Sequence, residues 1–71
     1  MNDHTPLIEF YDGFGSALPF QSVRSHAVPR RKEEINISSE WWEVTQVTWA
    51  IDRAEGAVDT LRACVELRRV K

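Results

Sequence analysis

Three side chains in this sequence could bind a soft metal ion or form a nucleophile and base pair: His4, His26 and Cys64. A metal site needs several such ligands at regular spacing, and a cysteine nucleophile needs a base held beside it. These residues are scattered over distant segments, and no CxxC motif is present. The sequence therefore predicts no metal, no cofactor and no catalytic residue. A chain of 71 residues also has little room to enclose a substrate pocket, so we expect no enzyme.

Basic side chains could form a face that binds phosphate groups. Small barrels often bind nucleic acid through such a face beside a stacking aromatic ring. Glu33, Glu34 and Glu40 lie in the same region and partly neutralise it, and the formal charge of the chain is −2. Nucleic-acid binding is therefore the alternative function, and a solvated charged surface is the simpler interpretation. The basic residues concerned are Arg24, Arg30, Arg31, Lys32, Arg68 and Arg69.

Two adjacent tryptophans suggest a surface for a partner protein. In a strand, Trp41 and Trp42 point to opposite faces, and Trp42 shares its parity with the apolar Val44, which places Trp41 outside. An exposed tryptophan is a favoured interface anchor because it buries a large area at little cost in rotamer freedom. The alternative is that N-terminal residues fold over Trp41. We expect an interface with a protein partner or a second copy in a homodimer, formed by Trp41, Glu43 and Arg62.

The elements that must position these residues are mostly short alternating strands. Residues 1–6 are polar, end at Pro6 and are expected to be a loose segment, and 7–71 are expected to form a single compact β domain. Asp12-Gly-Phe-Gly15 is a turn signal, and Pro19 and Pro29 bound a weak pattern typical of an edge strand or loop. The predicted strands are 7–11, 34–37 and 41–52, and 20–28 is expected to be an edge strand or an extended loop.

Residues 41–52 change parity halfway along. Trp42 and Val44 share one face of a regular strand, whereas Val47, Trp49 and Ile51 would fall on the other face. A β-bulge near residues 45–46 adds one residue and returns both groups to one side. The same bulge bends the strand, as a small sheet requires if it is to curl into a barrel.

The C-terminal stretch fits two structures. As a strand, Leu61, Ala63, Val65 and Leu67 alternate with polar residues, and residues 53–59 form a hairpin loop. As a helix over 53–69, the same stretch has an apolar stripe and a capping box formed by Asp52 and Glu55. Gly56 weakens the helix, and the preceding strand needs a partner, so the strand is favoured.

The middle of the chain resembles a known family. Val28-Pro-Arg-Arg-Lys-Glu-Glu-Ile-Asn-Ile37 followed by Glu40 to Asp52 gives a proline and charged turn, a short strand, a turn and a long bent strand. This order resembles small SH3-like β-barrel proteins of bacteria, phages and mobile elements. In those proteins the turn after the proline often contains glycine, where this sequence has Lys32. The resemblance covers about residues 28–70, and it implies a fold but no activity.

We therefore expect an all-β fold, a small SH3-like, partly closed antiparallel barrel of about five strands, with α+β as the alternative. The function expected is a non-catalytic protein-interaction module that can self-associate. One cysteine forbids an internal disulfide, and no signal peptide or apolar run long enough to cross a membrane is visible, so a cytoplasmic setting without a membrane partner is expected. The predicted core is Ile8, Phe10, Ile35, Ile37, Trp42, Val44, Val47, Trp49, Ile51, Leu61, Val65 and Leu67.

Overall fold

The computed structural model describes residues 5–13, 15, 18–52 and 60–70, and in these ranges the protein is all-β. A single sheet holds five strands in the order β2-β1-β5-β4-β3. Residues 60–70 are a strand, so the helix alternative over 53–69 is wrong there, and the predicted loop 53–59 lies outside the described residues. The strands are β1 (Leu7–Asp12), β2 (Gln21–Arg24), β3 (Glu34–Ile37), β4 (Glu40–Asp52) and β5 (Thr60–Val70).

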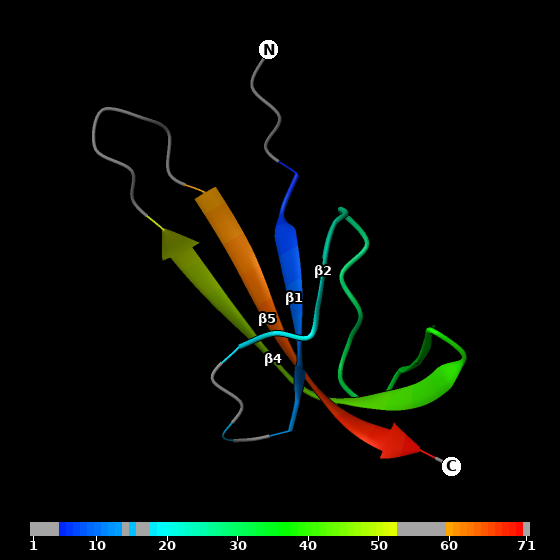
Figure 1. Ribbon diagram of the computed structural model, residues 1–71. Helices are drawn as coiled ribbons and strands as arrows, with labels where there is room; N and C mark the ends of the chain where they lie inside the picture. Colours follow the sequence, from blue (N-terminus) through cyan, green and yellow to red (C-terminus); the bar gives the residue numbers. More distant parts are fainter. Residues whose placement is uncertain (1–4, 14, 16–17, 53–59, 71) are drawn as a thin grey trace.

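The two long strands β4 and β5 form a twisted antiparallel ribbon across the molecule, and the other strands flank it (Figure 1). β1 lies along the free side of β5 in a parallel pair, and β2 pairs antiparallel with β1. On the other side, β3 pairs antiparallel with β4. The first part of β4 curls strongly, so the sheet is a partly closed small barrel, mostly antiparallel as predicted.

The predicted β-bulge is confirmed. The register of β4 against β5 shifts between Val44 and Gln46, which leaves Thr45 as the extra residue. The Thr45 hydroxyl donates a 3.1 Å hydrogen bond to the carbonyl oxygen of Glu66 on β5. Residues 47, 49 and 51 thereby join Trp42 and Val44 on one side of the sheet, which we call the inner face.

The core lies on this inner face. Its buried side chains come from β1, β4 and β5, and each is 6% exposed or less. Partly buried Val28, Ile35, Ile37 and Val47 pack against them. Ala63 belongs to the core although the prediction did not include it. The buried residues are Ile8, Phe10, Trp42, Val44, Ala63, Val65 and Leu67.

Three residues predicted for the core are exposed: Trp49 is 49% exposed, Ile51 67% and Leu61 40%. The sequence predicts correctly the face to which these side chains point, because the register and the bulge place all of them on the inner face. The prediction of burial was wrong because the pairing of β3 with β4 ends at Glu43. No described strand continues alongside the second half of β4 to cover these side chains.

Turns with positive φ tighten the region where β3 meets β4. Ser38 and Ser39 have φ of 52° and 70°, the pattern of a two-residue hairpin turn that normally favours Asn-Gly. Lys32 has φ of 78°, so the position where the resemblance expects glycine does adopt a left-handed conformation. Gly13 and Gly15 in the predicted turn also have positive φ, at 74° and 90°.

The segment 1–6 is described only at its last two residues. The carbonyl of Thr5 accepts a 3.1 Å hydrogen bond from the Arg24 side chain, and the carbonyl of Pro6 accepts one of 3.2 Å from the Ser25 amide. Pro6 itself is buried. These bonds continue the β1–β2 pairing beyond its regular part. Within the described ranges, no helix has the length and apolar character that crossing a membrane requires.

Candidate protein-interaction surface

The second half of β4 is an unpaired strand edge. One side of β4 pairs with β5 along its whole length, whereas β3 covers the other side only from Glu40 to Glu43. The pairing is extended by one residue, because Val44 makes two 2.8 Å backbone hydrogen bonds, one with Lys32 and one with Glu33. No described residue pairs with the outer edge of residues 46–52, which we call the free edge. A free edge is a template for another strand.

Apolar side chains stand exposed beside this edge on the inner face. Register places Val23, Ile8, Ala63 and Trp49 in one row across four strands. The inner pair of this row is buried, but Val23 is 44% and Trp49 49% exposed. We call the exposed inner-face side chains of Val23, Trp49, Ile51 and Leu61 the open end. The fold thus leaves apolar side chains exposed at both ends of this row, Val23 on β2 and Trp49 on β4, and Trp49 continues into Ile51 and Leu61.

A groove of about 820 Å³ adjoins the free edge. One wall is the segment that leads from β2 to β3, and the other wall is the bulge and the following residues of β4. Among the described residues, no carboxylate pairs with the guanidinium of Arg30 or Arg31 in this groove. An aromatic ring, aliphatic walls and free cations therefore meet here. The lining residues are Val28, Pro29, Arg30, Arg31, Thr45, Gln46, Val47 and Trp49.

The outer face of the sheet carries a paired polar cluster. Arg62 forms ion pairs with Glu9 at 3.0 Å and with Asp52 at 3.2 Å, and the hydrogen bond that it donates to Glu9 is the main cause that raises the pKa of Arg62. The Tyr11 hydroxyl donates to Glu9 at 3.2 Å. Partial burial, and then the nearby Glu9 charge, raise the pKa of Tyr11 above its usual value. Both carboxylates of this cluster thus share one guanidinium within the sheet.

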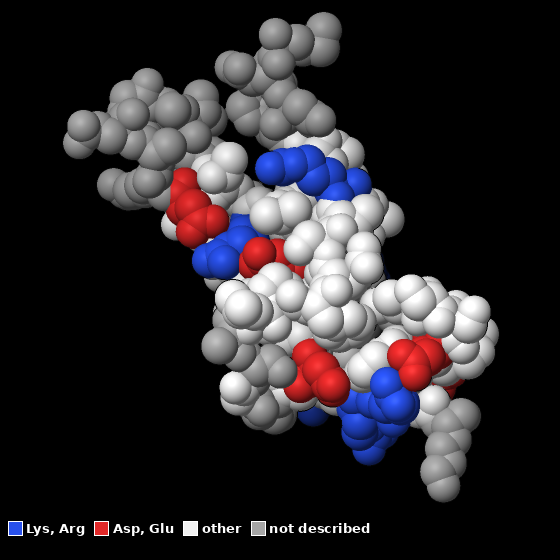
Figure 2. Space-filling model, in the orientation of Figure 1, with Lys and Arg blue, Asp and Glu red and all other residues white. Residues whose placement is uncertain are grey.

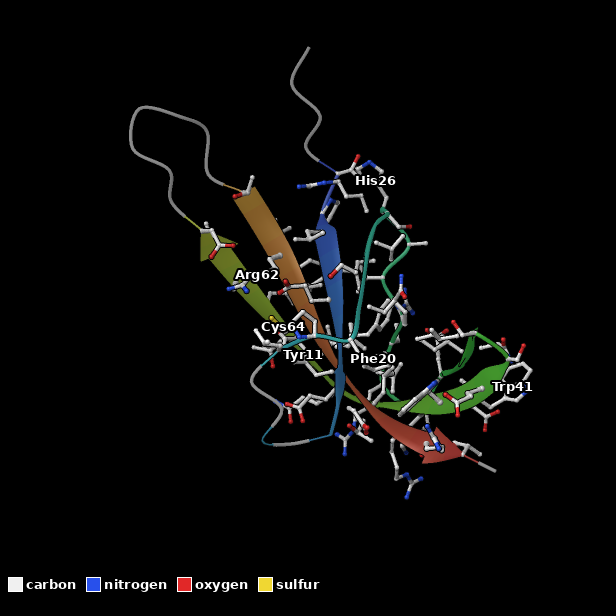
Figure 3. The ribbon with its side chains drawn as sticks, in the orientation of Figure 1. Tyr11, Phe20, His26, Trp41, Arg62 and Cys64 are labelled. Carbon is white, nitrogen blue, oxygen red and sulfur yellow. The ribbon has the colours of Figure 1, made fainter. Side chains whose placement is uncertain are left out.

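The predicted interface residues do not form one surface. Trp41 is 50% exposed, so its predicted outward orientation is confirmed. Glu43 forms an ion pair with Arg68 near Trp41. Arg62 lies toward the other end of β5, since Trp41 pairs with Val70 and Arg62 with Ala50. That separation is about 25 Å along the strand at roughly 3.3 Å per residue, and Figure 3 shows Trp41 and Arg62 far apart.

The basic residues are also dispersed. Arg24 donates to the Thr5 carbonyl at the β1–β2 end. Arg68 is paired with Glu43, and Arg69 with Glu40 at 2.9 Å. Arg30 and Arg31 line the groove, whereas Arg31, Lys32 and Arg68 lie around a shallow hollow that also includes Glu43. The face in Figure 2 shows blue and red groups side by side rather than a patch of one sign.

The soft ligands stay apart. His26 follows β2 and is hydrogen-bonded to the Thr5 hydroxyl at 3.3 Å, while Cys64 lies on β5, and the two are separated in Figure 3. His4 lies outside the described residues. In the described ranges, no three His, Cys, Asp or Glu side chains gather where they could hold a metal ion.

Sequence reasoning missed Trp49 and the free edge as surface features. The missing signal was present in the strand lengths: the predicted strand 34–37 is far shorter than its hairpin partner 41–52. A short strand must leave part of a long partner unpaired. Comparisons with protein-family models, with curated proteins and with solved structures find no match for this chain.

Proposed function

We propose that this protein is a non-catalytic protein-interaction module that binds an extended segment along the free edge of β4. The observation that carries the proposal is the unpaired edge 46–52, bordered by the exposed side chains of Trp49 and Ile51. In strand addition, backbone hydrogen bonds supply affinity and alternate side chains supply specificity. This edge offers both, because its inner-face residues are apolar and two of them, Val47 and Trp49, line the groove.

Energetics favour this surface over the surface around Trp41. Trp41 is similarly exposed, but its strand neighbours on both sides are occupied by Asn36 of β3 and Val70 of β5. A partner at Trp41 would gain side-chain burial only. At Trp49, a partner gains burial of the ring together with a ladder of backbone hydrogen bonds.

A second candidate function, nucleic-acid binding, is favoured by one arrangement. The half-exposed Trp49 lies in the same groove as Arg30 and Arg31, whose guanidinium groups have no carboxylate partner among the described residues. A stacking ring beside free cations suits single-stranded nucleic acid. The mixed charges elsewhere and the net charge of −2 argue for the protein partner first.

The test is a selection of random peptides that bind the immobilised chain, with mixed DNA and RNA oligomers assayed in parallel. We expect peptides whose binding changes little with salt, is lost in Trp49→Ser and is retained in Trp41→Ser, which removes an equally exposed ring from the same strand. Binding to oligomers that falls steeply with salt and is lost in Arg30→Gln with Arg31→Gln would instead support nucleic-acid binding. If neither peptides nor a second copy of the chain bind, the proposal is wrong.

Two finer assignments stay within this proposal. The curled, five-stranded sheet and the left-handed Lys32 support the assignment to the SH3-like barrels. A strand-by-strand comparison of the pairing order with that of those barrels would test it. The unpaired Cys64 supports a cytoplasmic setting, which cell fractionation would test.

A further inference from the structure

We propose that the free edge of β4 binds a second copy of this chain, with the two β4 strands joined antiparallel about a two-fold axis at Trp49. This inference rests on the proposed function and names its partner. Two-fold pairing uses the same surface twice, so the edge must be complementary to itself. The backbone, the side chains and the charges of residues 46–52 meet that condition.

Every second residue of the free edge has a backbone N–H and C=O that point outward and can bond to another strand. Val44 directs its N–H and C=O toward the chain that enters β3, in two hydrogen bonds of 2.8 Å. After the bulge, the next residue paired with β5 is Gln46, opposite Glu66. Because bonded and non-bonded pairs alternate along an antiparallel ladder, every second residue from there directs both groups away from β5. These residues are Val47, Trp49 and Ile51.

One register uses the whole free edge. When Trp49 lies opposite the partner's Trp49, every residue from 46 to 52 has a counterpart from 52 to 46 of the partner. A two-residue shift toward the bulge places Val44 opposite the partner's Asp52, but the outer edge of Val44 is already bonded. A shift in the other direction leaves residues 46 and 47 opposite positions beyond β4, which ends at Asp52.

In this register the exposed apolar groups cover one another. Val47 faces the partner's Ile51, and Trp49 faces the partner's Trp49, on the inner face of a continuous sheet. Ile51 is 67% exposed, while Val47 lines the groove beside Val28. The partner's Ile51 therefore reaches the groove, and the two-fold axis repeats this contact. The most exposed aliphatic side chain of the free edge fills the hollow beside the bulge.

The charges of the edge agree with the same register. On the outer face, Thr48 faces the partner's Ala50, and Gln46 faces the partner's Asp52. Gln46 lines the groove together with Arg30 and Arg31, so the pairing brings a carboxylate toward two guanidinium groups that have no carboxylate partner among the described residues. No like charges lie opposite each other. Around Trp41, by contrast, β4 is already paired with β3 on one side and with β5 on the other, so no second copy can add a strand there.

The first experiment measures mass by light scattering and sedimentation from low micromolar to about millimolar protein. We expect a concentration-dependent dimer, with a dissociation constant raised at least about tenfold by Trp49→Ser and less than about twofold by Trp41→Ser. Because both rings are half-exposed, the folded state should survive either change, and circular dichroism checks this. Equal effects of the two changes would overturn the interface.

The second experiment tests the register by disulfide formation in a Cys64→Ser chain, since Cys64 lies opposite Thr48 in the sheet and would compete. Thr48→Cys and Ala50→Cys are made in separate chains, mixed and oxidised. Directly opposed residues meet the distance that a disulfide requires, so we expect the mixed product, which joins position 48 of one chain to position 50 of the other. A dominant product that joins two copies of the same variant would place the axis elsewhere and overturn the proposed register.

Two outcomes separate this inference from the function on which it rests. If the chain stays monomeric at about millimolar concentration while selected peptides bind and depend on Trp49, the homodimer is wrong and the interaction module stands. If the chain is monomeric and no peptide binds, both are wrong. A dimer that survives Trp49→Ser unchanged keeps self-association but excludes the free edge as its site.

Discussion

Trp42 and Trp49 lie on the same strand and point to the same face of the sheet, but Trp42 is 3% exposed and Trp49 is 49% exposed. Trp42 lies in the part of β4 that is paired with both β3 and β5, Glu40–Glu43, which we call the closed end. Three contacts cover its side chain there. The ring of Phe20 packs at a centroid distance of 5.0 Å, the Arg69 guanidinium lies 5.2 Å from the ring centroid, and Ile35 pairs with it from β3. At the open end, β3 is missing beside Trp49 and its ring is half in solvent.

The difference shows that the face to which a side chain points and the burial of that side chain are separate properties. The face to which a side chain points follows from the two-residue period of the strand and from the bulge, both of which act locally. Burial requires a second element to lie over the side chain, and the length of β3 decides where that element ends. One strand can therefore contribute to a core at one end and expose apolar side chains at the other.

The largest expected effect comes from removing one ring at each end. Trp42→Ala should lower the free energy of unfolding by about 3–5 kcal/mol, because it leaves a cavity in the core. A domain of this size has about that much stability in total, so the variant should be largely unfolded. Trp49→Ala should cost about 1–2 kcal/mol, since half of its ring is already in water. Urea unfolding measures both. If Trp49→Ala is the more destabilising change, the comparison fails.

Amide hydrogen exchange should distinguish the two ends residue by residue. At low micromolar protein, the Val44 amide should be protected by its 2.8 Å bond to Glu33. The outward amides of Val47, Trp49 and Ile51 should exchange at least about tenfold faster than the amides that face β5. Nuclear magnetic resonance or mass spectrometry of the exchange gives this pattern. Uniform protection along β4 at low concentration would mean that the edge is covered within one chain.

A smaller effect, of opposite sign, is expected at the closed end. Lys32 has φ of 78°, a conformation that costs a side chain about 1–2 kcal/mol and costs glycine little. Lys32→Gly should therefore stabilise the fold by about 1 kcal/mol after the added chain entropy is subtracted. Arg31→Gly is the control, because Arg31 has no positive φ and should gain nothing. Urea midpoints that fall in both variants would contradict this account of the turn.

The smallest effect is expected on the outer face, at the Tyr11 hydroxyl that donates a hydrogen bond to Glu9. Burial and Glu9 raise the pKa of Tyr11 in the folded state, so the unfolded chain loses the phenol proton first as pH rises. This stabilisation is complete below about pH 10, the usual pKa of tyrosine, and decreases above it. The free energy of unfolding should fall less between about pH 9 and 11 in Tyr11→Phe than in the unchanged chain, when each protein is compared with its own stability at about pH 8. Urea midpoints measure this difference. An unchanged alkaline loss would exclude Tyr11 as its source.

Much of the fold was accessible from the sequence because it depends on local patterns. Alternating residues indicated the strands, and the parity change at residues 45–46 indicated the bulge that the structure contains. The same parity argument predicted the exposure of Trp41 and the burial of Trp42 correctly. The candidate site was less accessible. It depends on where one strand stops pairing, which local periodicity does not contain.

Sequence alone thus determined the strands 7–11, 34–37 and 41–52, the face to which each core residue points and the bend of β4, and it left residues 53–69 open between strand and helix. Tertiary structure decided which inner-face residues are covered, because coverage depends on contacts between residues far apart in the chain. It placed Phe20 and Arg69 over Trp42, inserted β1 parallel to β5, and left Trp49, Ile51 and Leu61 beside a free edge. The physical reason is that a strand's period is a property of its own backbone, whereas burial is a property of its neighbours.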